Sequence, residues 1–180
     1  MLLSRTRSIL MIIDVQERLA PSVAEPAAVI KNCAILMKAA AKLAVPMIVS
    51  QQYPRGLGLT VPELAALAAA DSVFDKVHFS CAADPGIAER IDALHRDQVV
   101  IGGIEAHICV MQTALQLGER GFRVSVVGDA VSSRRPADRD MAFHRLAQSG
   151  IDVSTTEMVM FEWLERAATP EFKELQALVK

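Results

Sequence analysis

Short, mostly apolar runs recur along the chain and restrict it to one class of fold. Six of them are candidate strands: residues 8–13, 47–50, 72–74, 98–101, 123–127 and 151–154. A short apolar run between turn residues is typical of a strand that is buried on both faces, as in a parallel sheet. Because the intervals between the runs are long enough to hold helices, the sequence predicts strands and helices in alternation.

Helical patterns fill most of these intervals. They cover residues 27–44, 85–95 and 136–148, and a short segment that begins at residue 170. In the first of them, apolar side chains including Cys33 repeat on one stripe. Asp84 followed by Pro85 is typical of a helix start. Right-handed βαβ connections then predict a three-layer α/β/α sandwich, with a doubly wound, mostly parallel six-stranded sheet, in one Rossmann-like domain over residues 1–180.

The charge balance excludes several classes of partner. With 19 basic and 21 acidic residues, the formal net charge is -2, which provides no basic surface for nucleic acid or an anionic membrane. The apolar run at residues 9–13 is too short for a signal sequence or for a membrane span of ~20 apolar residues. We therefore expect a cytoplasmic protein that acts on a small, neutral or modestly polar molecule.

The cysteines are few and widely spaced. Cys33, Cys81 and Cys109 are odd in number and include no CxxC pair. This pattern argues against a disulfide framework and against a cysteine-based zinc site, and it fits a reducing cytosol. Cys33 is expected to be a buried core residue because it lies on an apolar stripe. The position of Cys81, in a loop near the sheet edge, leaves its role open.

Polar residues follow three of the predicted strands. In doubly wound sheets, ligands bind outside the carboxyl ends of the strands, where the strand order reverses. Asp14 follows the first strand, Lys76 the third and Cys109 the fourth. Each has a structural alternative: Asp14 as a turn or cap residue, Lys76 as a solvated lysine and Cys109 as a small buried thiol.

The segment around Cys109 is the most informative of the three. Gly102 and Gly103 predict a tight turn, which would place Cys109 in the first turn of a helix. Free amides and the positive end of the helix dipole would favour a thiolate there and could hold an oxyanion. A phosphate cradle fits less well, because Glu105 would face the phosphate and no GxGxxG motif follows the first strand.

Together, Asp14, Lys76 and the Gly-Ile-Glu-Ala-His-Ile-Cys-Val run that contains Cys109 resemble the isochorismatase-like cysteine hydrolase superfamily. The resemblance extends over nearly the whole chain, from residues 12–16 through 128–133 to 155–158. Residues 52–58 and 60–64 resemble the subgroup of isochorismatase domain-containing proteins.

This resemblance implies roles for specific residues. Asp14, Lys76 and Cys109 would form the catalytic triad, and the peptide bond between Ile104 and Glu105 would be cis. The backbone amides of Glu105 and Cys109 would form an oxyanion hole. Cys109 would then attack a carbonyl carbon, and Asp14 would protonate the departing amine and leave a thioester that water hydrolyses.

The sequence also departs from members of the superfamily. Nicotinamidases bind a metal through an Asp and histidines after the second strand, but residues 15–70 contain neither Asp nor His, so no metal and no cofactor are expected. Isochorismatases proper cleave a vinyl ether without a cysteine nucleophile. Cys109 therefore favours a C–N bond of a small amide, imide or carbamoyl compound, with vinyl ether hydrolysis or a non-catalytic binding or regulatory role as alternatives.

Other side chains are candidates for a substrate pocket. These are Gln51, Tyr53, Phe79 and His107. Phe79 has the alternative of a core position and His107 that of a helix cap. Asp129 resembles a family position and is equally explained as a turn residue. The resemblance further implies a homo-oligomer.

Overall fold

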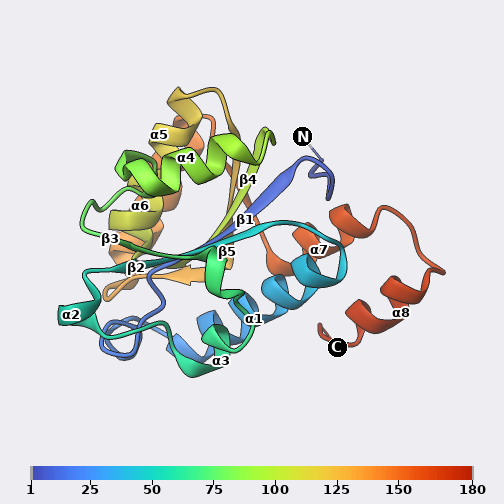
Figure 1. The fold of residues 1–180 in the computed structure, drawn as a ribbon, viewed down its shortest axis with the longest axis horizontal. Coiled ribbons are helices and arrows are strands. Elements are labelled where there is room, and N and C mark those ends of the chain that lie inside the picture. The colour runs from blue at the N-terminus through green and yellow to red at the C-terminus, as the bar shows by residue number, and fades with distance from the viewer. Residues whose placement is uncertain (1, 180) are drawn as a thin grey trace.

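A six-stranded sheet forms the middle layer of the protein (Figure 1). The computed structural model describes residues 2–179. The strands are β1 (Ser8–Ile13), β2 (Met47–Gln52), β3 (Val73–Lys76), β4 (Gln98–Ile104), β5 (Arg123–Ser132) and β6 (Asp152–Ser154). They are all parallel, in the order β3-β2-β1-β4-β5-β6. This confirms the predicted doubly wound sheet, whose strand order reverses between β1 and β4.

Helices cover both faces of the sheet (Figure 1). They are α1 (Pro26–Lys42), α2 (Pro54–Leu57), α3 (Pro62–Ala65), α4 (Pro85–Ala93), α5 (Met111–Glu119), α6 (Pro136–Gln148), α7 (Thr156–Leu164) and α8 (Pro170–Gln176). Shorter turns are η1 (Ala20–Ser22), η2 (Ala70–Ser72), η3 (Cys81–Ala83) and the π-helical η4 (Ala106–Val110). One apolar cluster includes α1, α3, α7 and α8, and the other includes α4, α5 and α6. The predicted three-layer sandwich is therefore confirmed.

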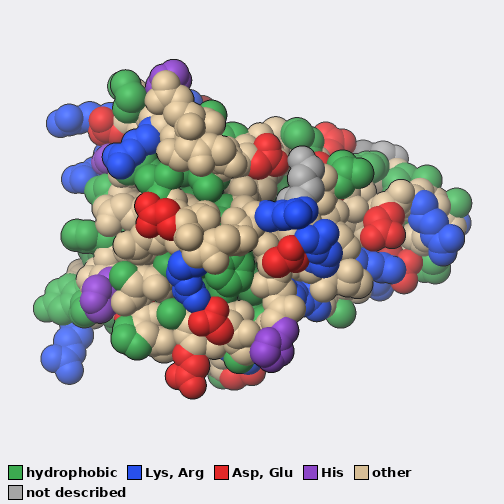
Figure 2. Space-filling model, turned by 90° about the horizontal axis from the view of Figure 1, so that it is seen from above, with side chains coloured by type: hydrophobic (Ala, Val, Ile, Leu, Met, Phe, Trp, Pro, Cys, Tyr) green, Lys and Arg blue, Asp and Glu red, His purple; other side chains and the backbone are tan. Residues whose placement is uncertain are grey.

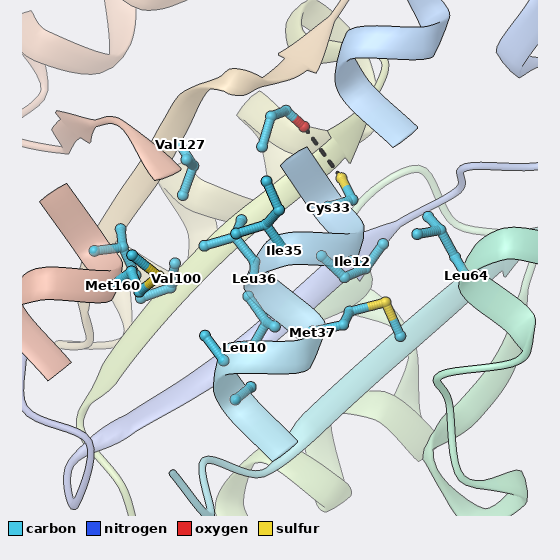
Figure 3. Packing of buried hydrophobic residues seen from close by; sticks show 14 of the residues in the cluster. Leu10, Ile12, Cys33, Ile35, Leu36, Met37, Leu64, Val100, Val127 and Met160 are labelled. Carbon is cyan, nitrogen blue, oxygen red and sulfur yellow. Dashed lines mark hydrogen bonds between the residues drawn. The ribbon is translucent and has the colours of Figure 1, made fainter. Parts of the chain in front are cut away.

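The central strand β1 shows how the sequence produces these layers. All of its residues are buried. Because side chains alternate along a strand, Leu10 and Ile12 belong to the cluster with α1, while Met11 and Ile13 belong to the other. Figure 3 shows Leu10 and Ile12 beside α1. Full burial of each such side chain contributes about 1.5–3 kcal/mol, so the point where β1 ends is strongly fixed.

Cys33 belongs to this core, as the apolar stripe predicted. It is fully buried in α1, and its thiol donates to the carbonyl oxygen of Ala130 at 3.4 Å (Figure 3). Burial, with a smaller effect of the Asp129 charge, raises the pKa of Cys33 to about 12. Cys33 is therefore a neutral structural thiol.

Strands β2, β3, β4 and β5 all end later than predicted, and the extension of β4 changes the interpretation of the glycines. β2 continues through Gln52, and β4 continues through Ile104, so Gly102 and Gly103 are strand residues. A Cβ on Gly103 would lie 2.1 Å from the carbonyl oxygen of Ile13, and the φ of Gly103 is +120°. Only glycine allows β4 to approach β1 this closely. The predicted tight turn was therefore wrong.

The surface shows no extended region of one charge on the face drawn in Figure 2. Acidic and basic side chains are intermixed there. Within residues 2–179, no helix combines the length and the apolar character that a membrane crossing requires.

Candidate active site

The predicted site residues converge at the carboxyl ends of three strands. Asp14 directly follows β1, Lys76 is the last residue of β3, and Cys109 lies in η4 after β4. Asp14 is 0%, Lys76 2% and Cys109 5% exposed. The Nζ atom of Lys76 lies 2.8 Å from Oδ2 of Asp14, and the charge of Asp14 raises the pKa of the buried Cys109 thiol. A carboxylate, an ammonium and a thiol thus meet near the reversal of strand order.

Asp14 is held from several directions. Its φ is 54°, a left-handed conformation that costs a non-glycine residue about 1–3 kcal/mol. Its backbone amide donates to the carbonyl oxygen of Ser50 at 3.1 Å, and its Oδ1 accepts from the Ser50 hydroxyl at 2.7 Å. Its Oδ2 accepts from Lys76. Both carboxylate oxygens are therefore directed at site residues, so the role of a turn or cap residue does not describe Asp14.

Four acceptors surround the ammonium of Lys76. Besides Asp14 Oδ2, they are Gln52 Oε1 at 2.6 Å and the carbonyl oxygens of Phe79 at 3.1 Å and His78 at 3.2 Å. An ammonium has only three N–H donors, so all of them find partners within the chain. Burial alone would lower the pKa of Lys76, but the nearby Asp14 charge raises it overall. Lys76 is therefore a buried, fixed cation, and the solvated-lysine alternative was wrong.

Cys109 lies in a π-helical turn rather than in the first turn of α5. Within η4, the amides of Ile108 and Val110 both donate to the carbonyl oxygen of Glu105. The helix α5 begins only at Met111. Single π-helical turns are frequent at functional sites, because the extra residue re-aims the side chains.

The thiol of Cys109 is protonated in the resting site. Burial raises its pKa, the charge of Asp14 raises the pKa further, and Lys76 offsets this only in part. The expectation of a resting thiolate was therefore wrong, because desolvation outweighs the favourable end of a helix. A protonated thiol can act as a nucleophile only when a base takes its proton, and Asp14 is the carboxylate whose charge acts on this thiol.

The segment between β4 and Cys109 is fastened to the end of β5. Glu105 is 4% exposed, and its carboxylate accepts from the amide of Arg134 at 2.9 Å and from Nε of Arg134 at 3.1 Å. The peptide bond between Ile104 and Glu105 is cis. The backbone that carries the proposed oxyanion-hole amides is thus tied to a neighbouring loop.

Two of the predicted pocket side chains lie on the surface beside the site. Tyr53 follows β2, and its amide donates to the carbonyl oxygen of Lys76 at 2.8 Å. Phe79 supplies a carbonyl oxygen to Lys76. Tyr53 and Phe79 are both 55% exposed. The core alternative for Phe79 was therefore wrong, and both aromatic rings are accessible to a ligand.

His107 is partly buried and faces the end of β5. Its Nδ1 lies 2.9 Å from the hydroxyl oxygen of Ser133, and its Nε2 lies 3.9 Å from Oδ2 of Asp138. These contacts link η4 to β5 and to the start of α6, so the side chain does not cap a helix.

Gln51 does not face the triad, contrary to its prediction as a pocket residue. Its Oε1 accepts from the amide and hydroxyl of Thr60 at 2.7 and 3.0 Å, and its Nε2 donates to Asp75 at 2.8 Å. Strand alternation instead directs Ser50 and Gln52 toward the site. These two residues were not recognised in the sequence; period-two alternation through a β2 extended to residue 52 would have found them.

Cys81 also lies next to the triad. It is fully buried, its amide donates to Oγ1 of Thr113 at 2.9 Å, and its thiol donates to Oγ of Ser50 at 3.5 Å. Burial, reinforced by the Asp14 charge, raises its pKa to about 11. Cys81 is therefore a neutral neighbour of Ser50, behind Asp14.

Metal-binding groups do not assemble within the part of the chain that the structure describes: no three His, Cys, Asp or Glu side chains are placed to hold one ion. Asp129 has a structural role instead. Its Oδ1 accepts from the amide of Thr156 at 2.8 Å and from the hydroxyl of Thr156 at 2.9 Å, which anchors the start of α7.

Comparisons with known proteins agree with this architecture. The model of the isochorismatase domain matches residues 8–158. Isochorismatase domain-containing protein 2 of Danio rerio is 40% identical over 177 residues, which cover 98% of this chain and 89% of the relative. The solved structure of the MAR1 ribonuclease from Caenorhabditis elegans has 38% identity and a TM-score of 0.93, and covers 99% of this chain and 92% of that one.

A more distant solved structure shares the fold. The YcaC gene product of Escherichia coli, described as an octameric hydrolase of unknown specificity, is 24% identical with a TM-score of 0.93, over 98% of this chain and 90% of that one. The domain match covers most of the chain, and the similarity to curated isochorismatase domain-containing proteins covers nearly all of it. The chain therefore belongs to the isochorismatase family.

Proposed function

We propose that this protein is a metal-independent hydrolase that cleaves a C–N bond of a small, neutral amide, imide or carbamoyl compound through a thioester on Cys109. The observation that carries the proposal is that Asp14, Lys76 and Cys109 are buried together at the carboxyl ends of three strands, with the Asp14 carboxylate paired to the Lys76 ammonium. Membership of a hydrolase family supports the reaction type. Asp14, Lys76 and Cys109 are the catalytic residues of this proposal.

Acylation begins from the protonated thiol. Asp14 accepts the proton of Cys109 while Sγ forms a bond to the carbonyl carbon of the substrate. The carbonyl oxygen becomes an oxyanion, which the amides of Glu105 and Cys109 stabilise; the loss of one such donor typically costs about 3 kcal/mol. Asp14 then returns the proton to the leaving nitrogen as the C–N bond breaks, which releases the amine or ammonia and leaves the thioester.

Deacylation repeats these steps with water. Asp14 accepts a proton from water as the water oxygen attacks the thioester carbon. The C–S bond then breaks, and the proton passes from Asp14 to Cys109. Lys76 remains a cation throughout, because its donors are all engaged and its pKa is raised. Its role is electrostatic: its fixed charge holds the Asp14 carboxylate in place between proton transfers.

The charges around the site favour a neutral substrate. The two cations of the hydrogen-bonded site, Lys76 and Arg134, are already paired with Asp14 and Glu105. A vinyl ether such as isochorismate carries carboxylates that need cationic partners in a desolvated site. An amide or imide needs only hydrogen bonds and an oxyanion hole. The paired cations therefore support C–N cleavage over vinyl ether cleavage.

The exposed rings beside the site suggest how a substrate is held. Tyr53 and Phe79 lie at the ends of β2 and β3 with more than half of each side chain accessible. Aromatic surfaces of this kind stabilise the apolar part of a small ligand. A substrate with a compact apolar body attached to the reacting carbonyl fits this arrangement.

A substrate panel tests the proposal. Ammonia or amine release is measured from small amides, imides and carbamoyl compounds, with isochorismate as the vinyl ether. An RNA oligonucleotide is added because a relative carries the ribonuclease name. Cys109→Ala should lose about a thousandfold or more of the C–N activity, whereas Cys33→Ala, which removes a buried thiol outside the site, should retain it. Turnover that survives in Cys109→Ala, or cleavage of isochorismate or RNA alone, would show the proposal to be wrong.

A further inference from the structure

Gln52 makes a contact with the site that the proposed chemistry leaves unexplained. Its side chain is largely buried, and both of its polar atoms are engaged. Oε1 accepts a hydrogen bond from Lys76 Nζ at 2.6 Å, and Nε2 donates to the carbonyl oxygen of Val77 at 2.9 Å. Because the amide nitrogen is tied to Val77, the amide oxygen is the atom that faces the ammonium.

A second glutamine fixes the backbone of Gln52. Gln16 is fully buried, and its Oε1 accepts from the amide of Gln52 at 2.7 Å. Its Nε2 donates to the carbonyl oxygen of Gln52 at 3.0 Å and to that of Gly58 at 2.7 Å. A buried polar network in which each group has a partner is rigid. Gln52 is therefore held at both its backbone and its side chain.

The geometry around Lys76 indicates what this rigidity does. Gln52 is the residue paired with Lys76 in the register of β2 and β3. Gln52 and Asp14 are the closest acceptors, at 2.6 and 2.8 Å, while the two backbone carbonyls lie at 3.1 and 3.2 Å. The two short hydrogen bonds therefore set the direction of the ammonium, one from each of the adjacent strand ends.

We propose that Gln52, held by Gln16, is a positioning residue that keeps the Lys76 ammonium against Asp14, and thereby keeps Asp14 directed at Cys109. This inference rests on the proposed function, in which Asp14 exchanges protons with Cys109. The neighbouring residue Gln51 supplies a matched control, because it is an equally buried glutamine that points to the other face of β2.

Two substitutions separate the effect of losing the Gln52 acceptor from the effect of adding a charge. Gln52→Met removes the acceptor with little change of volume, and Gln52→Glu keeps an acceptor but adds a negative charge. The titratable and charged groups that act on the Lys76 ammonium, which Gln52 contacts, are Asp14 directly after β1, Cys81 from η3 and Cys109 from η4. The added charge would oppose loss of the proton from Asp14, the proposed base.

The first measurement is the acylation burst with 4-nitrophenyl acetate, an activated neutral ester, followed as 4-nitrophenolate release over a range of pH. Gln52→Met should lower the acylation rate constant by about tenfold or more, equivalent to one charge-assisted hydrogen bond, with little change in KM. Gln52→Glu should move the acid limb of the profile up by about one pH unit. Gln51→Met should change neither quantity.

The second measurement needs no substrate. In protein labelled with nitrogen-15 lysine, the ammonium signal of Lys76 is identified by its loss in Lys76→Met. Its protons should exchange slowly with water in the wild type, and about tenfold or more faster in Gln52→Met but not in Gln51→Met. A role of Gln52 in general stability alone would lower the unfolding midpoint without changing this exchange or the acid limb.

The outcomes distinguish this inference from the proposed function. If the burst requires Cys109 but both Gln52 variants keep the wild-type rate constant and acid limb, the positioning role is wrong and the hydrolase proposal stands. If no acylation of Cys109 occurs in the wild type, the hydrolase proposal fails. The ammonium exchange then decides the contact itself: unchanged exchange in Gln52→Met overturns the positioning role, and faster exchange supports it.

Discussion

Replacement of Lys76 by methionine tests how strongly the buried ion pair supports the fold. Methionine keeps an unbranched apolar stem and removes the charge. Asp14 would then be a fully buried carboxylate. It would keep the hydrogen bond from the Ser50 hydroxyl to its Oδ1 but would lose the one from Lys76 to its Oδ2. Removal of one partner from a buried ion pair typically destabilises a protein by about 3–5 kcal/mol, because the other charge is left uncompensated. We expect a loss of this size at neutral pH.

The magnitude has two sources that differ in their pH dependence. The first is the uncompensated carboxylate charge, whose cost is smaller at acidic than at neutral pH because a neutral acid costs less to bury. The buried acceptor Gln52 Oε1 also loses its donor, whereas His78 and Phe79 are exposed residues whose carbonyl oxygens can accept from water. Each unsatisfied buried group costs about 1–3 kcal/mol. That part should persist at acidic pH, so the loss should decrease without vanishing.

Urea unfolding at neutral and acidic pH, followed by circular dichroism, measures both parts. Lys42→Met is the matched control, since Lys42 pairs with Glu174 on the surface and its replacement should leave the urea midpoint nearly unchanged. If Lys76→Met were as stable as this control, or if its loss were the same at both pH values, the account of a buried, charge-compensated pair would be refuted.

Other properties should follow from the same structure. Gly103→Ala should strongly lower the melting temperature, because the added methyl group would lie 2.1 Å from Ile13 O, whereas Gly86→Ala, with its nearest contact at 3.6 Å, should not; equal melting temperatures would contradict this packing. Because burial raises the pKa of Cys33 to about 12, the folded state keeps a proton that the unfolded chain releases above about pH 9. Between about pH 9 and 12, this thiol should therefore make the free energy of unfolding fall by about 1.4 kcal/mol per pH unit. An equally steep decline in Cys33→Ala would show that the thiol is not involved. Phe79→Ala should raise KM for an apolar substrate by about threefold to tenfold with little change in kcat, and steady-state kinetics with kcat lowered and KM unchanged would speak against a substrate contact.

The parts of the fold that depend on local pattern could be predicted from the sequence. The apolar run of β1 predicted a fully buried central strand, and Asp84 before Pro85 predicted the start of α4, where its carboxylate accepts from the amides of Gly86 and Ile87. The convergence of the site residues followed from the rule that parallel strands present their carboxyl ends at one edge. These inferences need only local chemistry and a topology.

Features that depend on exact register and on burial could not be predicted in this way. The assignment of Gln51 to the pocket was wrong because β2 continues through Gln52, and the alternation of side chains along the strand directs Ser50 and Gln52, not Gln51, to the site. The prediction that Cys109 rests as a thiolate was wrong. Its ionisation is decided by desolvation and by the charge of Asp14, and only tertiary packing supplies these. Gly103 was taken for a turn because sequence does not show how closely β1 approaches it.

Covalent capture of the acyl group tests the central claim most directly. The protein is mixed with 4-nitrophenyl acetate, quenched in acid, and examined by intact mass and by peptide mapping. The account predicts one acetyl group on the thiol of Cys109, sensitive to hydroxylamine, formed slowly or not at all in Asp14→Asn and absent from Cys109→Ala. Turnover of the ester in Cys109→Ala at the wild-type rate, or acetylation confined to other residues, would contradict a thioester mechanism at this site.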